Sequence, residues 1–261
     1  LALLTSVLKA DPPATIAPHA LFLSGRQAIA AADWPAAEQS MQRLVKDYAS
    51  SSLAPTASYW LAEAAYQQGN LEQARERFSQ LPAELAKGQG ELPAMAALRS
   101  AQCSAALKDW RQAEQQATAA LDKFPEFTQL YELHYVRGRA LAARAQFNDA
   151  REAYRLVTRS STGGKTETAA MAQWMIGETY FHQENFEVAI REYLKVEILY
   201  DQPLWQSAAL LQAGKCYERL GQYGEAAELF TRLIKDFPDS PHAADDSTRL
   251  PLARQRSANN K

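Results

Sequence analysis

The sequence predicts an all-α protein built from consecutive helix pairs. An alanine recurs six times, at steps of 37, 39, 37, 39 and 37 residues. Three positions before each of these alanines stands a large apolar residue, and twelve positions before it stands a glycine or an alanine. Self-similarity at a fixed period is the signature of repeat architectures, so we expect six copies of one unit. The recurring alanines are Ala37, Ala74, Ala113, Ala150, Ala189 and Ala226.

The residues that precede the alanines indicate how such units pack. Apolar residues recur at three- and four-residue spacing on both sides of a short polar break, which predicts two amphipathic helices in each copy. Small residues let two helices approach closely, and large residues fill the remaining space. The small sites are Gly25, Ala62, Ala101, Gly138, Gly177 and Gly214. The large sites are Trp34, Leu71, Trp110, Phe147, Phe186 and Tyr223.

The six helix pairs are expected at residues 18–53, 55–90, 92–127, 129–166, 168–203 and 205–240. Six prolines fall between the copies, and Pro35 stands just inside the start of a second helix, where its missing N–H costs little. The six are Pro55, Pro93, Pro125, Pro203, Pro238 and Pro241. The sixth copy shows the pattern most fully, with Tyr217 on its first helix, Gly221 in the turn and Phe230 on its second helix. The third copy departs most, because it has small residues at sites that are bulky elsewhere. These are Ser104, Ala117 and Ala120.

The two ends of the chain lie outside the six copies. Residues 4–12 align with residues 230–238, so residues 1–13 are expected to be the end of a truncated preceding repeat. We therefore expect these residues to be part of a larger parent chain. Residues 241–261 are expected to form a short capping helix over 243–250, which ends before Pro251, and a frayed tail.

The composition argues against several classes of protein. The 261 residues are 47% hydrophobic and 22% charged, with a formal net charge of −2. This is too apolar for a disordered chain. No stretch approaches the roughly 18–20 apolar residues of a membrane helix, so no transmembrane segment is expected. The near-neutral charge argues against nucleic acid as a partner.

The arrangement resembles the tetratricopeptide repeat, in which a small residue lies early in the first helix and an alanine early in the second, followed by an aromatic residue and a final proline. The resemblance covers roughly residues 18–240. It implies a right-handed α–α superhelical solenoid of about six helix pairs, with a concave groove for a protein or peptide. The ending at residues 236–241 is also similar to repeats of bacterial envelope proteins, namely the lipoprotein partner of the outer-membrane assembly machine and the coordinator of the Tol–Pal system. That similarity points to the periplasmic side of the cell envelope as an alternative location.

No residue pattern indicates catalysis. The Gly-Gly-Lys-Thr segment at 163–166 imitates the end of a phosphate-binding loop, but Arg159 stands where that loop requires a glycine. The four histidines have no metal-binding spacing, and Cys103 and Cys216 form no CxxC motif, so neither a metal nor a cofactor is expected. We therefore expect a non-enzymatic scaffold for protein–protein interaction. The alternative is the docking arm of a larger enzyme or signalling protein whose catalytic part lies outside this segment.

The resemblance also implies which residues would line the groove. They lie one, four and five positions after the small site of each first helix, and three positions before it. The candidates are Phe22, Arg26, Tyr59, Glu63, Tyr66, Gln102, Tyr135, Arg139, Trp174, Glu178, Phe181, His182 and Lys215. Their charges are mixed in sign, which fits a peptide held by aromatic anchors better than a simple carboxylate clamp.

Other interpretations of the same residues stay open. Tyr59 and Trp174 would serve equally well to pack against the neighbouring unit. Glu63 with Arg139 or Gln102 would form a ladder between repeats that needs no ligand. A third class of function is RNA binding by helical repeats, and the mixed-sign groove and the net charge count against it.

Overall fold

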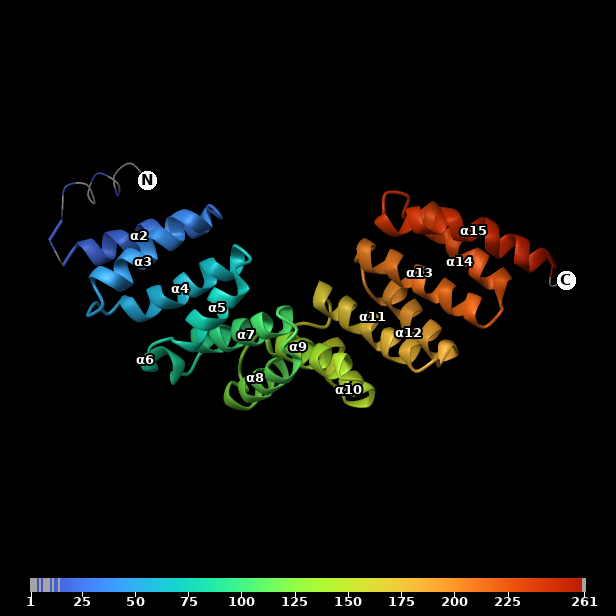
Figure 1. Cartoon of the computed structure of the whole chain (residues 1–261), viewed down its shortest axis with the longest axis horizontal. Helices are drawn as coiled ribbons and strands as arrows, with labels where there is room; N and C mark the ends of the chain where they lie inside the picture. The colour runs from blue at the N-terminus through green and yellow to red at the C-terminus, as the bar shows by residue number, and fades with distance from the viewer. Residues whose placement is uncertain (1–3, 5, 7–9, 11, 14, 260–261) are drawn as a thin grey trace. The chain divides into compact units, whose positions relative to one another are not determined.

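The computed structural model contains helices and turns, and no strand, in the part of the chain that it describes. That part is residues 4, 6, 10, 12–13 and 15–259, without the side chains of residues 84, 86 and 244–247. The predicted end of a preceding repeat at 1–13 lies largely outside it. The first helices of the pairs are α2 (Ala17–Ala30), α4 (Ala54–Gln67), α7 (Glu91–Ala106), α9 (Leu130–Ala143), α11 (Glu167–His182) and α13 (Pro203–Arg219) (Figure 1). The second helices are α3 (Trp34–Asp47), α5 (Leu71–Ser79), α8 (Trp110–Lys123), α10 (Phe147–Thr158), α12 (Phe186–Leu199) and α14 (Tyr223–Asp236).

The chain divides into two compact units, unit 1 (Leu1–Val136) and unit 2 (Arg137–Lys261). In unit 1, helices α2, α3, α4, α5, α7 and α8 each pack against the next. In unit 2, helices α10 to α15 do the same. The predicted all-α array of consecutively packed helix pairs is confirmed within each unit, since every helix buries its apolar stripe against its chain neighbours.

The recurring small residues lie where helices meet most closely. All six recurring alanines, one on each second helix, are fully buried, with 0% of their surface exposed. Four of the small sites on the first helices are glycines, and a Cβ there would overlap the side chain sixteen residues later. At Gly138 and Gly177 it would lie 2.6 Å from the ring of Tyr154 or Tyr193, respectively. The large residue at that place on the second helix thus occupies the volume that the glycine leaves open.

The turn inside each pair has one conformation in all six copies. Its central residue has a positive φ, between 55° and 78°, five positions before the recurring alanine. The next residue donates its backbone N–H to the carbonyl five residues back, as in Asp33 to Ala28, with an N···O distance of 2.9 Å. This pattern ends a helix through a left-handed residue. Glycine stands there in two copies only, and the positive-φ residues are Ala32, Gly69, Lys108, Ala145, Glu184 and Gly221.

The third pair has a cavity beside its small residues. Ala117 and Ala120 are buried, and the short helix α6 (Ala83–Ala86) lies in the connection that precedes α7. The cavity lies between α5, α7 and α8 and measures about 260 Å³. Alanines in place of the large residues of other copies leave this space unfilled. Its lining includes Phe78, Leu81, Ala96, Ala97, Ala120 and Phe124.

The C-terminal segment differs from the prediction. One helix, α15 (Pro241–Asn259), runs through Pro251, where we expected a short helix to end and a frayed tail to begin. Pro251 lacks a backbone N–H, so one intrahelical hydrogen bond is missing there. Packing against α14 compensates for the loss: Ala253 is 1% exposed, and the Arg256 guanidinium lies 5.4 Å from the centre of the Tyr223 ring.

Both cysteine thiols are buried in these helix pairs. Burial raises the pKa of Cys103 to about 11 and that of Cys216 to about 12, with the carboxylates of Glu63 and Glu178 acting in the same direction. At pH 8 about a thousandth or less of each thiol is therefore ionised, and only the thiolate reacts. We expect a disulfide reagent such as DTNB to label neither cysteine in the folded protein within minutes, and to label both in guanidinium chloride. Rapid labelling of one thiol without denaturant would show that its helix pair opens locally.

Candidate functional site

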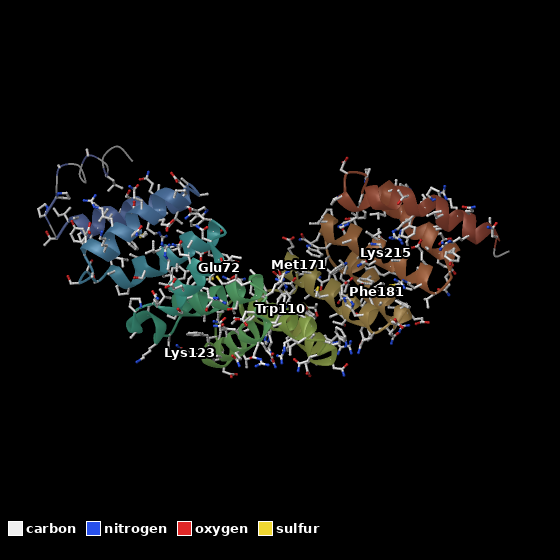
Figure 2. All side chains as sticks on the ribbon, in the orientation of Figure 1. Glu72, Trp110, Lys123, Met171, Phe181 and Lys215 are labelled. Carbon is white, nitrogen blue, oxygen red and sulfur yellow. The ribbon has the colours of Figure 1, made fainter. Side chains whose placement is uncertain are left out.

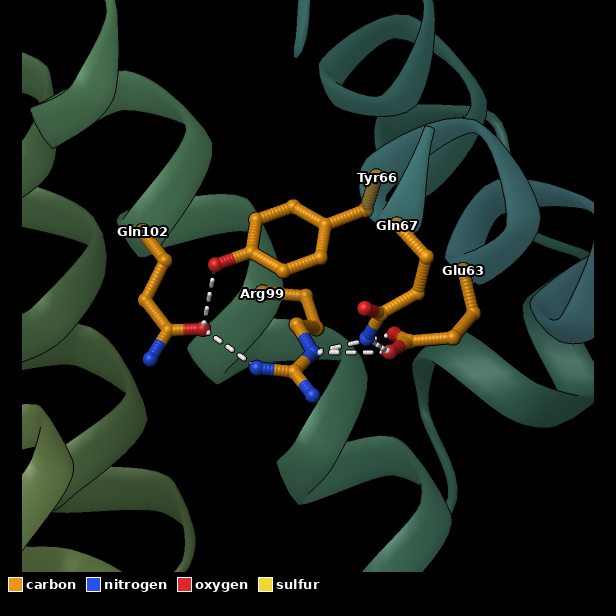
Figure 3. A network of polar contacts seen from close by, with 5 residues as sticks. All are labelled: Glu63, Tyr66, Gln67, Arg99 and Gln102. Carbon is orange, nitrogen blue, oxygen red and sulfur yellow. Dashed lines mark hydrogen bonds and ion pairs between the residues drawn. The ribbon is translucent and has the colours of Figure 1, made fainter. Parts of the chain in front are cut away.

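In unit 1, several predicted groove residues bind one another across neighbouring first helices. Arg99 on α7 donates through Nε to both carboxylate oxygens of Glu63 on α4, at 3.2 and 3.0 Å (Figure 3). Its Nη1 donates to Gln102 Oε1 at 2.8 Å, and its guanidinium lies 4.7 Å from the centre of the Tyr66 ring. Gln67 donates a further bond to Glu63 at 2.7 Å. The ladder that we considered for Glu63 therefore exists, but Arg99 is its partner and Gln102 joins through Arg99.

Two of the predicted groove residues in unit 1, Glu63 and Tyr59, are buried. Glu63 is 4% exposed, and its charge is compensated by Arg99. Tyr59 is 3% exposed, packs edge-on against Trp60 and also contacts the Phe78 ring, whose centre lies 6.0 Å from its own. Burial and the nearby Glu63 carboxylate raise the pKa of the Tyr59 hydroxyl well above its usual value. Tyr59, three positions before Ala62, and Glu63, one position after it, are therefore held among neighbouring helices, and their role in lining a groove stays a prediction.

The remaining candidates of unit 1 are half-buried or exposed. Arg26 is exposed and places its guanidinium 4.8 Å from the centre of the Trp60 ring. Phe22 is half-buried and packs against the cluster that contains Met41 and Leu44. Tyr135, on α9, is also half-buried. Arg139 is half-buried too. It belongs to unit 2 and Glu63 belongs to unit 1, so the ladder between Glu63 and Arg139 stays a prediction.

In unit 2, Glu178 is the centre of a second polar cluster. Its Oε1 accepts a hydrogen bond from Tyr193 at 2.5 Å and another from Gln212 at 2.8 Å. Its Oε2 lies 3.9 Å from Nε2 of the exposed His182. Burial, together with the Glu178 carboxylate, raises the pKa of Tyr193 far above its usual range, so the hydroxyl stays a donor. Glu178 thus links α11 to both α12 and α13.

The contacts between first helices share one register. Three pairs of neighbouring first helices show the same contact. One partner is the residue directly after the small site of the earlier helix. The other is the residue two positions before the small site of the later helix. The contact is a cation–π pair between Arg26 and Trp60. It is a charged pair between Glu63 and Arg99, and a hydrogen bond between Glu178 and Gln212. The column that we assigned to a ligand therefore also holds neighbouring repeats together.

Trp174 lies in a half-buried aromatic cluster of unit 2. Its ring centre is 5.7 Å from that of Trp205 on α13 and 6.2 Å from that of Tyr193 on α12. The Trp205 indole donates to the exposed Glu167 carboxylate at 3.0 Å. Trp174 therefore contacts its neighbouring repeat, and its half-exposed ring also meets solvent.

Phe181 and Lys215, two predicted groove residues from different helices, line one cavity of about 340 Å³ in unit 2. Both side chains are labelled in Figure 2. Glu218 and Arg219 of α13 contribute to it, and α15 contributes three further side chains, Arg249, Leu252 and Arg256. Glu218 accepts from Arg249 Nη1 at 2.9 Å. Sequence reasoning missed Leu252 and Arg256 because it ended the capping helix before Pro251, and it missed Arg249 because it considered only the first helices of the pairs as groove lining. Arg249, Leu252 and Arg256 lie at helical spacing across that proline, and this spacing was the available signal.

Arg151 on α10 is a buried cation that the sequence analysis did not single out. It is 7% exposed, and its Nη1 donates to Thr179 and to Gln183 at 3.2 and 2.7 Å. Its guanidinium also lies 4.2 Å from the centre of the Tyr180 ring and bonds to Asn148. Arg151 thus ties α10 to the last turns of α11, and it follows a recurring alanine directly.

The Gly-Gly-Lys-Thr segment forms the turn between α10 and α11. Thr166 caps α11 by accepting from the Ala169 N–H at 3.4 Å, and Gly164 N–H donates to Ser160 at 2.9 Å. The segment before it is helix α10, whereas a phosphate-binding loop follows a strand. Among the described residues, no group of three potential ligands gathers in a way that would hold a metal ion. No helix in the described part is long and apolar enough to cross a membrane.

The family comparison agrees with the helix-pair pattern. A model described as tetratricopeptide repeat-like domain matches residues 17–174, and a tetratricopeptide repeat model matches residues 208–240. The chain belongs to the tetratricopeptide repeat family. The first match spans more than half of the chain, and the second falls on the sixth copy, in which the sequence pattern is most complete.

Several solved structures have a similar fold at low sequence identity. The apo form of RapI aligns with a TM-score of 0.75 at 14% identity, over 98% of this chain and 77% of that one. PilF of Pseudomonas aeruginosa aligns with a TM-score of 0.64 at 13% identity, over 90% and 99%. YrrB, described as having an unusual peptide-binding site, aligns with a TM-score of 0.55 at 16% identity, over 80% and 97%. No curated protein matches the chain in sequence.

Proposed function

We propose that this tetratricopeptide repeat protein is a non-enzymatic scaffold that binds a peptide segment of a partner protein in unit 2. The observation that carries the proposal is the cavity shared by Phe181 and Lys215, which come from successive first helices. Peptide-binding surfaces combine an apolar anchor site with polar groups that fix orientation, and this cavity offers both.

The two units differ in how many groove residues are still accessible. In unit 1, Tyr59 and Glu63 are buried, and Arg99 and Gln102 bond to each other and to their neighbours. In unit 2, Phe181 and Lys215 are half-buried and face a common space. The polar side chains of unit 1 therefore serve mainly to join repeats, which favours unit 2 as the binding surface.

Selection from a random peptide library on the immobilised protein would test this function. We expect enriched peptides to bind the unchanged protein and to bind the Phe181→Ser and Lys215→Gln variants about tenfold more weakly, because these residues line the cavity. Leu204→Ser and Arg191→Gln are matched controls, since both residues are exposed in unit 2 and neither lines the cavity. Thermal melting of each variant checks its fold.

Two outcomes would contradict the proposal. Enriched peptides that bind all four folded variants alike would place the binding surface elsewhere. A library that yields no enrichment would contradict a peptide-binding role for the repeats.

A further inference from the structure

We infer that the cavity of the third helix pair binds a small neutral aromatic molecule with two fused rings. This cavity of about 260 Å³ lies between α5, α7 and α8, and we call it the α8 cavity. The site belongs to unit 1, so the inference goes beyond the peptide binding proposed for unit 2 and does not depend on it. Its described lining includes Phe78, Leu81, Pro93, Ala96, Ala120 and Phe124.

The sequence of α8 explains why this space is present. Seven positions after the recurring alanine, four other copies have a leucine or a valine that is fully buried, with 0% of its surface exposed. The third copy has Ala120 at that position and Ala119 before it, where the same four copies have longer side chains. A missing branched side chain leaves a cavity that its neighbours fill only in part. The buried residues of the other copies are Leu44, Val157, Val196 and Leu233.

The α8 cavity has a buried floor and an exposed rim. Phe78, Ala96 and Phe124 are 6%, 7% and 4% exposed, respectively. Ala119 and Lys123, which also line the cavity, are exposed. A molecule can therefore enter from solvent beside Ala119 and lose most of its contact with water inside. Removal of apolar surface from water is the main driving force for such binding.

The polar side chains that line the cavity have partners within the protein. Gln116 Nε2 donates to Ser100 Oγ at 2.9 Å, and Gln116 Oε1 accepts from Ser104 at 2.7 Å. Lys123 lies at the exposed rim, where its ammonium is 4.9 Å from the centre of the Phe124 ring. An apolar cavity binds apolar molecules in preference to water, which needs several polar partners. A charged ligand would lose its hydration on the apolar floor, so we expect a neutral one.

The volume and the two phenylalanines indicate the size and kind of ligand. An apolar cavity of about 150 Å³ holds one benzene molecule. The α8 cavity, at about 260 Å³, therefore has room for two fused rings. Phe78 on α5 and Phe124 at the end of α8 can make edge or offset contacts with a ring, which favours an aromatic molecule over a saturated one. Ser100 Oγ accepts one bond from Gln116 and has a second lone pair for an N–H of the ligand, so indole is a suitable probe.

Methyl NMR with indole as the ligand tests the inference. In protein that is isotope-labelled at its alanine methyl groups, we expect indole to shift the signals of the alanines that line the cavity, because its ring current acts on them. The shifts should saturate with a dissociation constant of about 1 mM or below. Buried alanines of unit 2 outside the cavity, such as Ala169 and Ala209, should not shift. The alanines of the lining are Ala96, Ala97, Ala119 and Ala120.

Two pairs of comparison molecules separate aromatic character and size from charge. Phenol has a single ring and cyclohexanol is its saturated counterpart, so we expect affinity to fall from indole to phenol and again to cyclohexanol. Indole-5-carboxamide and indole-5-carboxylate have nearly the same size and differ in charge. We expect the carboxylate to bind at least about tenfold more weakly than the carboxamide, because its charge would leave water.

Filling the cavity should remove the site. Ala120→Leu introduces the side chain that the first and sixth copies have at this position, so we expect indole to bind at least about tenfold more weakly. Ala97→Leu fills the same space from α7 and is the second variant if Ala120→Leu does not fold. Ala106→Leu is the matched control, because it adds the same volume at an exposed alanine of α7 outside the lining and should change the affinity less than about twofold. Melting curves check that each variant folds.

Several outcomes would overturn the inference. No saturable shift of the lining alanines at millimolar indole would mean that the cavity takes no such ligand. Equal affinity of the filled variants and the unchanged protein would place the bound indole elsewhere. Binding of the carboxylate as tight as that of the carboxamide, or of cyclohexanol as tight as that of phenol, would contradict a neutral aromatic ligand. Displacement of indole by a tryptophan-containing peptide at much lower concentration would assign the cavity to a side chain of a partner protein.

Discussion

Gly214→Ala is expected to lower the free energy of unfolding by about 3 kcal/mol, although alanine normally favours a helix over glycine. Gly214 lies on α13, and a Cβ there would lie 2.8 Å from Cδ1 and Cζ of Phe230 and closer still to Cε1. The Phe230 ring is fully buried, so it has no free space into which to move. The two helices must separate or the ring must leave its rotamer, and thermal or urea unfolding measures the cost.

A matched control is available on the partner helix. Gly224 is also helical, but a Cβ there would meet only Ser257 Oγ, at 3.4 Å. Gly224→Ala should therefore leave stability unchanged or raise it by up to about 0.5 kcal/mol. A loss from Gly224→Ala as large as that from Gly214→Ala would refute the steric explanation.

A double-mutant cycle isolates the clash itself. Phe230→Ala alone is expected to cost about 4 kcal/mol through the cavity that it leaves. In that background the Gly214→Ala substitution should cost nothing, because the pair then reproduces Ala101 and Ala117 of the third repeat. Additive losses would mean that Gly214 is required for its backbone and not for the space that it leaves to the ring.

The sequence predicted the steric requirements within one helix pair. The small sites and the alanine column are fixed by the closest approach of two helices, and only glycine or alanine satisfies it. The pattern therefore predicts which residues are buried, and all six column alanines are. The sequence did not predict the left-handed turn residues, because Lys108 and Glu184 carry no local signal for a positive φ. The helices on both sides of the turn hold these residues in that conformation.

The site was less predictable than the fold. Residues on the first helices were assigned to a groove from the family register, but that register says nothing about which of them meet each other. Arg99 and Gln212 occupy the same position relative to the small site, and both bind a glutamate of the preceding first helix. The offset between neighbouring first helices decides that pairing. It arises from packing of whole helices, which no local sequence pattern encodes.

Arg99→Met is expected to destabilise the protein by about 3 kcal/mol, the second-largest effect that we predict. Glu63 is 4% exposed, and the cation that pairs with it is Arg99. Although burial disfavours the charged form of Arg99, the Glu63 carboxylate keeps the pKa of the guanidinium above its usual value, so the guanidinium is charged. Methionine retains much of the packing volume and leaves the buried carboxylate without its cation, although the amide of Gln67 still bonds to it. Unfolding in urea at neutral pH measures the loss.

Removing the carboxylate charge should restore most of that stability. In the Arg99→Met background, Glu63→Gln leaves a neutral amide that can still bond to Gln67, so we expect the double variant to lie within about 1 kcal/mol of the unchanged protein. Arg75→Met is the matched control, because Arg75 pairs with Asp109 at 3.6 Å on the exposed surface and should cost less than about 1 kcal/mol. If Arg99→Met costs no more than Arg75→Met, the buried pair contributes little to joining these repeats. If Glu63→Gln then adds a further loss instead of recovering stability, the carboxylate itself, and not its unpaired charge, is what the interface needs.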